Sequence, residues 1–455
     1  MSKPIRVFQT AQETDDRLKE LDALVFGPVP DYTCQWVIAD PSYRFQTIEG
    51  FGGAFTEAGA VTLQKLTAAK QDEVMRAYFD PEHGHGYTLC RTHINSCDFS
   101  LGNYAYTETP GDVELRDFTI ARDHQALIPM IKHAMRVRGP DLKIFASPWS
   151  PPAWMKTNGQ MNTGGALKPE YCAAWAQYYC RYVAEYAKAG IPLWGLTVQN
   201  EPITESKWDN CLWTPEEERD FILDYLGPAL HQHGLKYLKL MAWDQNRNRI
   251  FERARAILEN PQAAKYVWGL AYHWYAGDNF ENLRFVHDIW PDKKLLFSEG
   301  CQEGGAFPGS WTVAERYGFS VINDLNRWSV GWTDWNMVLD ENGGPNHAGN
   351  FTHAPILVDT RTGEVMIQPA FAYLGHFSRF IKPGAQRIVA STTRDDLLTT
   401  AFVNPDGRVA VVVMNKTDNA AGFTLRYRQG GAKTQCPAHS IRTFVFEQEP
   451  VAKDF

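Results

Sequence analysis

The sequence has no apolar run long enough to cross a membrane as a helix. Such a helix needs about 20 consecutive apolar residues, and the 455-residue chain contains no such run. Its first residues, MSKPIRVFQT, also lack the apolar segment of a secretory signal. We therefore expect no membrane span and a cytoplasmic location.

Cysteine pairs and basic runs are also missing. None of the eight cysteines forms a C-x-x-C pair, so zinc ribbons and dithiol redox motifs are not expected. The formal net charge is -8, without the basic segments that bind nucleic acid. No metal, cofactor or nucleic-acid partner is therefore predicted. The oligomeric state stays open.

Aromatic residues, in contrast, are abundant. They make up 13% of the chain and include 15 tryptophans. Tryptophan offers a flat apolar face on which a sugar ring can stack, although any one of these side chains could equally pack in the core.

The middle of the chain alternates short apolar segments with longer helical ones. Eight segments are apolar enough for parallel strands buried on both faces. They are residues 50–55, 87–94, 142–147, 193–199, 238–243, 267–274, 294–298 and 330–336. Helical segments between them include 170–190 and 214–234. This alternation predicts an α/β fold with a (β/α)8 barrel. A doubly wound sheet is the alternative, but no glycine-rich phosphate loop follows any strand.

The two ends of the chain have a different pattern. Residues 401–403 and 408–414 are β-prone and flank the turn sequence Asn-Pro-Asp-Gly, which predicts a hairpin. Residues 423–427 alternate apolar and polar side chains, as a further strand would. A strand-like segment at 34–38 could join the same sheet from the other end of the chain. We therefore divide the chain into an N-terminal segment (1–48), a barrel (49–384) and a C-terminal β domain (385–455).

Two glutamates occupy the positions where barrel enzymes place functional groups, the C-terminal ends of strands. Glu201 follows the fourth predicted strand and Glu299 the seventh, and strands so related face each other across the ring. A retaining glycosidase needs two carboxyl groups about 5 Å apart, one attacking and one protonating the leaving group. Either residue alone could form an ordinary ion pair on the barrel rim. The pair, with polar and aromatic residues at neighbouring strand ends, favours catalysis.

Long motifs in register give the chain a family resemblance. They are FQTIEGFGGAF (45–55), NSCDFS (95–100), ASPWSPPAWMKTNG (146–159), VQNEP (198–202), HWY (273–275), FSEG (297–300), GWTDWN (331–336), GGPN (343–346) and LGHFSRFI (374–381). With these motifs the chain resembles glycoside hydrolase family 30, and within it the glucosylceramidase branch. The resemblance implies a TIM barrel with a β-sandwich built from both chain ends.

The resemblance also implies roles for individual residues. It makes Glu201 the acid/base and Glu299 the nucleophile of a retaining β-glycosidase. It assigns sugar binding to Asp98, Trp149, Asn200, Trp335 and Asn346, and places Arg91, His273 and Tyr275 around the carboxylates. His273 could instead be an ordinary core histidine.

The expected substrate is a β-D-glucoside, with a β-xylosidase or β-1,6-glucanase as the alternative. Residues 302–314 are short and glycine-rich compared with lysosomal relatives, so the leaving group stays open.

Two other classes of protein remain as alternatives. A metal-dependent hydrolase would draw on His83, His85 and His93, but the first two precede a strand, and surface-loop histidines are the better interpretation. A non-catalytic sugar-binding protein would not need two carboxylates at strand ends.

Overall fold

A computed structural model describes residues 4–29 and 34–448. The chain forms two compact units. One contains the residues up to Gly50, Gly309–Val330 and the residues from Gln368 onward, and the other contains Phe51–Pro308 and Gly331–Ile367. None of the described helices is long and apolar enough to span a bilayer.

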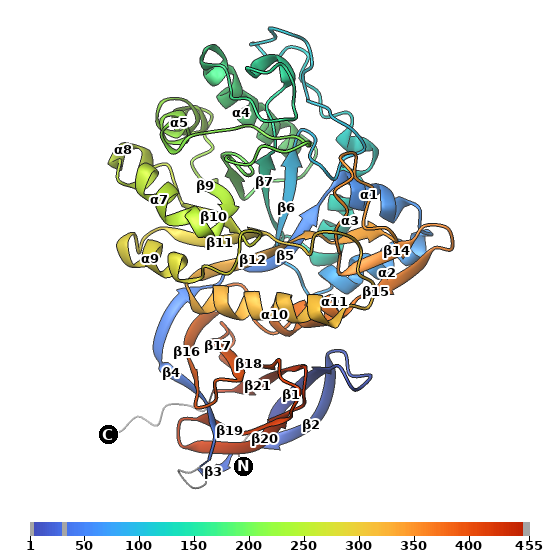
Figure 1. The fold of residues 1–455 in the computed structure, drawn as a ribbon, viewed down its shortest axis with the longest axis vertical. Coiled ribbons are helices and arrows are strands. Elements are labelled where there is room, and N and C mark those ends of the chain that lie inside the picture. The colour runs from blue at the N-terminus through green and yellow to red at the C-terminus, as the bar shows by residue number, and fades with distance from the viewer. Residues whose placement is uncertain (1–3, 30–33, 449–455) are drawn as a thin grey trace. The chain divides into compact units, whose positions relative to one another are not determined.

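Eight strands of the larger unit close into a barrel in the order β10-β11-β12-β5-β6-β7-β8-β9 (Figure 1). Their bounds are β5 (Gly50–Phe55), β6 (Leu89–Ile94), β7 (Lys143–Pro148), β8 (Gly195–Thr197), β9 (Lys239–Asn246), β10 (Gly269–His273), β11 (Lys294–Glu299) and β12 (Ser329–Asn336). Each lies in or overlaps one of the eight segments predicted from the sequence. The predicted (β/α)8 barrel is confirmed.

Apolar side chains and close backbone contacts hold the barrel together. Leu89, Phe145, Met241, Ala271 and Leu296, one from each of five strands, form a buried cluster. Gly52 of β5 approaches β6 so closely that a Cβ there would lie 1.9 Å from the carbonyl oxygen of Leu89. Any larger residue would therefore separate these two strands.

Helices connect the strands and surround the barrel (Figure 1). They are α1 (Glu57–Gln64), α2 (Ala68–Phe79), α3 (Leu127–Arg138), α4 (Cys172–Lys188), α5 (Pro215–Phe221), α6 (Gly227–Gln232), α7 (Ile250–Leu258), α8 (Pro261–Ala264) and α9 (Glu281–Ile289). The helix predicted at 170–190 is α4. The one predicted at 214–234 begins at a capping box between Thr214 and Glu217, as its sequence indicates. It is divided into α5 and α6 by a π-helical turn, Ile222–Leu226.

A small sheet after the last barrel strand was not predicted. It contains β13 (Val338–Asp340), β14 (Ile356–Asp359) and β15 (Glu364–Ile367). Strands β13 and β14 are parallel, and β15 is antiparallel to β14. These strands have only three or four residues, too few for a clear period in the sequence.

The other unit is built around a ten-stranded sheet in the order β2-β1-β21-β18-β17-β16-β4-β19-β20-β3. N-terminal strands, blue in Figure 1, lie beside C-terminal strands, which are red. The bounds are β1 (Pro4–Ala11), β2 (Lys19–Val25), β3 (Gly27–Pro28), β4 (Trp36–Thr47), β16 (Gln386–Thr392), β17 (Leu397–Val403), β18 (Arg408–Asn415), β19 (Ala421–Tyr427), β20 (Gly430–Cys436) and β21 (Ser440–Glu447).

The three predictions for this sheet are confirmed, and the strand predicted at 423–427 is part of β19. The hairpin is β17–β18, with Val403 opposite Val409. The strand predicted near 34–38 is β4, which pairs with β16 and β19. Helices α10 (Trp311–Asn326) and α11 (Pro369–Ser378) belong to the same unit. His376 of α11 is hydrogen-bonded to Thr443 of β21 and Thr10 of β1, and so links both chain ends.

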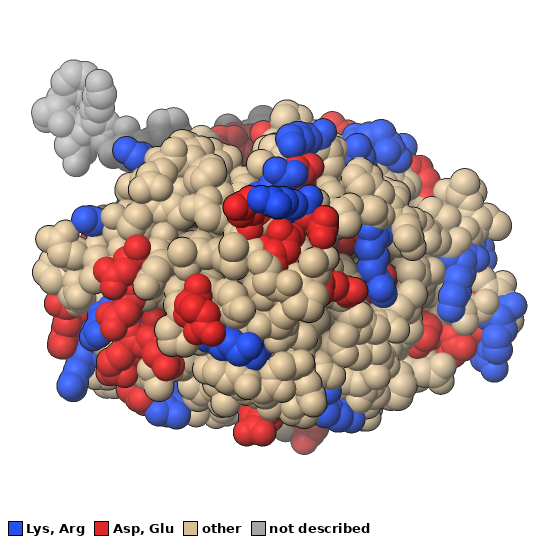
Figure 2. Space-filling view, turned by 90° about the horizontal axis from the view of Figure 1, so that it is seen from above, with Lys and Arg blue, Asp and Glu red and all other residues tan. Residues whose placement is uncertain are grey.

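Charges of both signs are interspersed on the face shown in Figure 2, with wide uncharged areas between them.

Candidate active site

A cavity of about 220 Å³ lies at the C-terminal ends of the barrel strands. Seven of the residues singled out from the sequence line it: Asp98, Trp149, Asn200, Glu201, Tyr275, Glu299 and Trp335. Seven others that line it were not singled out: Thr204, Trp208, Asn246, Cys301, Glu303, Asn350 and Thr352. The folded barrel thus gathers side chains from positions far apart in the sequence into one pocket.

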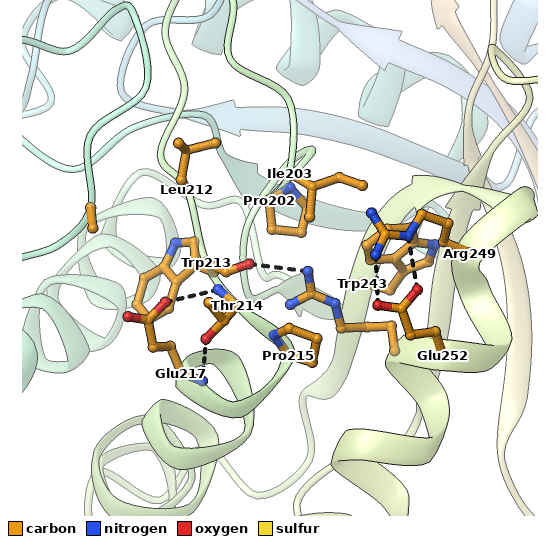
Figure 3. A pocket seen from close by; sticks show the side chains of 12 residues that line it. Pro202, Ile203, Leu212, Trp213, Thr214, Pro215, Glu217, Trp243, Arg249 and Glu252 are labelled. Atoms are coloured by element: carbon orange, nitrogen blue, oxygen red, sulfur yellow. Dashed lines mark hydrogen bonds and ion pairs between the residues drawn. The ribbon is translucent and has the colours of Figure 1, made fainter.

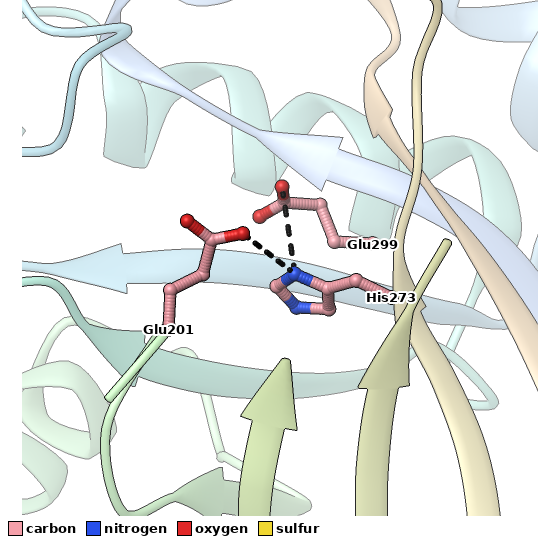
Figure 4. A group of neighbouring side chains, drawn as sticks. All are labelled: Glu201, His273 and Glu299. Carbon is pink, nitrogen blue, oxygen red and sulfur yellow. Dashed lines mark hydrogen bonds and ion pairs between the residues drawn. The ribbon is translucent and has the colours of Figure 1, made fainter. Parts of the chain in front are cut away.

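Glu201 and Glu299 face each other across His273 (Figure 4). Nδ1 of His273 lies 3.3 Å from Oε1 of Glu201 and 4.0 Å from Oε1 of Glu299. One oxygen of each carboxylate and one nitrogen of the imidazole all lie within 4.8 Å of one another. The two carboxyl groups can therefore act on a single atom placed between them.

The carboxylate of Glu299 receives two further hydrogen bonds. Nη1 of Arg91 lies 2.6 Å from Oε2, and the hydroxyl of Tyr275 donates to Oε1 at 2.9 Å. Burial raises the pKa of Glu299, and the positive charges of His273 and Arg91 oppose that rise. Glu201 has fewer partners and is the more exposed of the pair, at 13% of its side chain against 7%.

Asp244, at the end of β9, connects the cationic groups. It accepts hydrogen bonds from Arg91 at 2.6 Å, Ser298 at 2.6 Å and Thr197 at 2.7 Å, and it pairs with Nε2 of His273 at 3.1 Å. Its burial disfavours ionisation, but Arg91 and His273 hold the pKa of Asp244 well below its usual range. The sequence showed a polar residue after an apolar strand here, but nothing in it gave Asp244 a role.

His273 is positively charged in this environment. Burial opposes the charge, but Glu299 and the hydrogen bonds to Asp244 and Glu201 raise the pKa of His273 to about 9. An ordinary core histidine would not be expected to contact two glutamates and an aspartate at once, as His273 does.

Strained backbone accompanies this network. Glu201 (φ 48°), Asp244 (φ 54°) and Asn95 (φ 62°) all adopt left-handed conformations that are rare without glycine. Each of these conformations costs about 1–3 kcal/mol, and such residues tend to cluster at functional sites.

Gly300 directly follows Glu299, and a Cβ on Gly300 would lie 2.5 Å from the ring of Phe297. The glycine that follows Glu299 is therefore a packing requirement.

Two stacked indoles form an aromatic wall of the pocket. The rings of Trp149 and Trp335 are 5.1 Å apart with an interplanar angle of 20°, and the guanidinium of Arg91 lies 4.8 Å from the Trp149 ring. Asn200 accepts a hydrogen bond from Arg91 through Oδ1, which leaves its amide N–H groups to donate.

Asp98 lines the same cavity as the two glutamates, is almost fully buried, and accepts a hydrogen bond from Asn350 at 3.3 Å. Burial and the negative charge of Glu299 raise the pKa of Asp98 to about 8. Asn346, assigned to sugar binding by resemblance, does not line the cavity. Its Oδ1 accepts from the backbone of Ala348 and Asn350, so it shapes the loop that presents Asn350.

Metal binding is chemically disfavoured at the Glu201–His273–Glu299 cluster. Both ring nitrogens of His273 are engaged by carboxylates, and an imidazolium has no lone pair for a metal. Two of the histidines considered for a metal hydrolase differ in their exposure to solvent. His83 is exposed, whereas His85 is buried against Tyr78 and Tyr87. The prediction that both are surface-loop residues is therefore wrong for His85.

A neighbouring cavity of about 310 Å³ lies beside Pro202 and Ile203 (Figure 3). Its charged side chains are already paired: Arg249 with Glu252, and Arg253 with the carbonyl of Trp213 and with Glu218. Its two lining carboxylates are held as well, Glu217 by the backbone N–H of Thr214 and Glu252 by Arg249, so the smaller cavity with its facing glutamates is the candidate active site.

Comparisons with known proteins cover both the barrel and the C-terminal strands. Residues 48–381 match the model of the glycosyl hydrolase family 30 TIM-barrel domain, and residues 384–444 match that of the family 30 beta sandwich domain. Lysosomal acid glucosylceramidase of Mus musculus is 37% identical over 430 residues, covering 90% of this chain and 83% of that protein.

Two further similarities extend the comparison. An endo-1,6-beta-D-glucanase of Aspergillus fumigatus is 28% identical over 460 residues, covering 94% of this chain and 92% of its own. The crystal structure of SrfJ from Salmonella typhimurium superposes with a TM-score of 0.95 at 35% identity, covering 98% of this chain and all of that one.

Proposed function

Because the chain belongs to glycoside hydrolase family 30 and is therefore a retaining glycosidase, we propose that Glu299 is its nucleophile and Glu201 its acid/base. The observation that carries this proposal is the oxygen separation of at most 4.8 Å between the two carboxylates. Retaining enzymes hold their carboxyl groups about 5–5.5 Å apart, whereas inverting enzymes leave about 6.5–9.5 Å for a water molecule.

The charges of the site support this division of roles. Arg91 and His273 supply two positive charges, and Asp244 and Glu299 balance them with two negative ones. Glu201 is not bonded to Arg91 and is the more exposed of the two glutamates, as suits the group that meets the leaving oxygen and then water. Hydrogen bonds from Arg91 and Tyr275 favour the ionised form of Glu299, as a nucleophile requires.

The reaction then proceeds in two displacements. A carboxylate oxygen of Glu299 attacks the anomeric carbon while the bond to the leaving oxygen breaks and Glu201 protonates that oxygen. In the second step Glu201 takes a proton from water, which attacks the glycosyl ester and releases Glu299. The free amide hydrogens of Asn200 are available to donate to the sugar 2-hydroxyl, a contact that strengthens in the transition state.

We propose a β-D-glucoside as the substrate. The indole wall of Trp149 and Trp335 offers apolar faces to a sugar ring, and Asp98 can bind its distal hydroxyls. A cavity of about 220 Å³ is smaller than the ~300–1,000 Å³ that drug-sized ligands occupy. It suits a single glycosyl unit and therefore removal of terminal residues.

The similarity to an endo-1,6-beta-D-glucanase keeps that activity as the second candidate. An endo enzyme needs an open cleft, which the small cavity does not favour.

A cytoplasmic location remains our prediction, and the absence of disulfides among the eight cysteines supports it.

The test is a panel of aryl β-D-glucoside, xyloside and galactoside with a β-1,6-glucan, followed by NMR of the first-formed anomer. We expect the highest kcat/KM on the glucoside and release of β-glucose. A preference for xyloside would replace the glucoside proposal and leave the roles of the two glutamates standing. Release of α-glucose would overturn those roles.

A further inference from the structure

A third cavity is larger than the two described above. It measures about 530 Å³ and is lined by residues 103–110 and 152–162. These segments follow β6 and β7, so the cavity opens among the loops at the C-terminal ends of the barrel strands, where such barrels bind ligands. It shares no lining residue with the glutamate pocket.

Trp154 gives this cavity a rigid aromatic surface. Its indole N–H donates to the carbonyl of Thr107 at 3.3 Å, and its ring meets Tyr171 edge to face at 5.0 Å. The side chain is half-buried, so it is held in place and still partly accessible. Pro110 and Pro152 add apolar surface beside it. A ring fixed in advance loses little conformational entropy when a ligand stacks on it.

Polar groups that suit hydroxyls surround this apolar surface. Glu108 uses one carboxylate oxygen for the backbone of Ala105, and Gln160 uses its carbonyl oxygen for Thr163. In the described chain no residue engages the other oxygen of Glu108 or the amide nitrogen of Gln160. Both side chains are exposed. An acceptor and a donor are thus available at the rim of an indole surface.

The composition of the lining decides between ligand classes. No lysine or arginine is among the described residues that line it, which disfavours phosphates and other anions. The polar rim disfavours a purely apolar ligand, whose binding would desolvate those groups without replacing their hydrogen bonds. A neutral sugar ring has an apolar C–H face for the indole and hydroxyls for Glu108 and Gln160.

Residues 207–209 connect the linings of the two pockets. Asn162 forms a β-bridge with Asp209, and its amide donates to the carbonyl of Lys207. The adjacent Trp208 lines the glutamate pocket. We propose that the Trp154 cavity is a second carbohydrate-binding site, which takes a neutral glycan unit independently of catalysis.

The test uses 19F NMR of protein labelled with 5-fluorotryptophan, with Glu299→Gln to prevent turnover. Gentiotetraose and cellotetraose are the probes, and Trp154→Phe identifies the Trp154 signal. We expect this signal to shift saturably with at least one probe. Trp154→Ala, which removes the reporting signal and is therefore followed by isothermal titration calorimetry with the same probe, and, separately, Glu108→Ala should weaken that binding event, the former roughly tenfold or more.

Trp290→Ala is the matched control, because Trp290 is half-buried at the end of α9 and lines neither pocket. It should leave both binding and the spectrum of Trp154 unchanged. With native Glu299, Trp154→Ala should keep its kcat/KM on an aryl glucoside, which separates this proposal from the catalytic one. A Trp154 signal unmoved by both probes at about 10 mM, or an affinity unchanged in both Trp154→Ala and Glu108→Ala, would overturn the proposal.

Discussion

The floor and the wall of the glutamate pocket are built in different ways. The floor consists of Glu299 and the buried barrel-strand side chains that contact it or each other, Arg91, Asp244 and His273, which are joined by buried ion pairs. The wall around Asp98 depends on the loop 346–350, which is held by hydrogen bonds of Asn346 to its own backbone. A floor of barrel-strand side chains fixes the reacting groups rigidly, whereas a loop wall can vary and select the sugar.

The largest effect should come from the floor, at Glu299. Glu299→Gln retains the shape of the side chain but removes the attacking carboxylate, so kcat on an aryl glucoside should fall roughly 10⁴-fold or more. The matched control is Glu205→Gln, an exposed glutamate outside the pocket lining, which should stay near wild type. Retention of more than about a tenth of wild-type activity would contradict the nucleophile assignment.

Asp244 should show the next largest effect, although it does not line the pocket. Asp244→Asn leaves Arg91 and His273 without their shared counter-charge, and the misplaced Glu299 should reduce kcat roughly hundredfold with little change in KM. Thr197→Val is the control, because it removes only a neutral hydrogen bond to Asp244. Steady-state kinetics of the two variants should therefore differ strongly. Equal losses would mean that the charge of Asp244 does not matter.

The floor and the wall should both make stability depend on pH. Asp98 (pKa about 8) and His273 (pKa about 9) retain protons in the folded chain at pH values where the unfolded chain has released them. Their contribution is complete at low pH and is lost as pH rises, from about 4 to 8 for Asp98 and from about 6.5 to 9 for His273.

The unfolding temperature should accordingly fall by several degrees between pH 5 and pH 9.5. Asp98→Asn mimics the protonated side chain, so it should reduce the slope below pH 8 while the part due to His273 persists. A slope unchanged by Asp98→Asn would show that Asp98 is not protonated in the folded state.

The smallest effect should separate two asparagines of the wall. Asn350→Ala removes the hydrogen bond to Asp98 and should lower kcat/KM about tenfold, mainly through KM. Asn346→Ala should act only through the loop and therefore cost less. If Asn346→Ala costs more, Asn346 contacts the sugar itself, as the family resemblance implies.

The contrast between a floor built on strands and a wall built on a loop also explains what could be predicted from the sequence. The barrel strands were predictable because buried parallel strands are continuous apolar segments, and the glutamates because they follow such segments directly. Asp244 was visible as a strand end, but its partners Arg91, Thr197 and Ser298 come from three other strands, so only the folded barrel reveals its role.

Asn350 could not have been found from the sequence. It lies in a loop without periodicity, and its contact with Asp98 spans 252 positions. Strands β1 and β2 were also missed. Both are edge or near-edge strands, and β2 is largely exposed, so the apolar pattern that marks a strand is weak there.

The most direct test of the central claim is the reaction of Glu201→Ala with a dinitrophenyl β-glucoside and azide. This leaving group needs no protonation, so Glu299 should still form the glycosyl ester. Azide, unlike water, needs no general base to attack that ester. The account predicts that azide restores turnover and that the product is the β-glucosyl azide. An α-glucosyl azide would show direct displacement without a covalent intermediate and would contradict the assignment of Glu201 and Glu299.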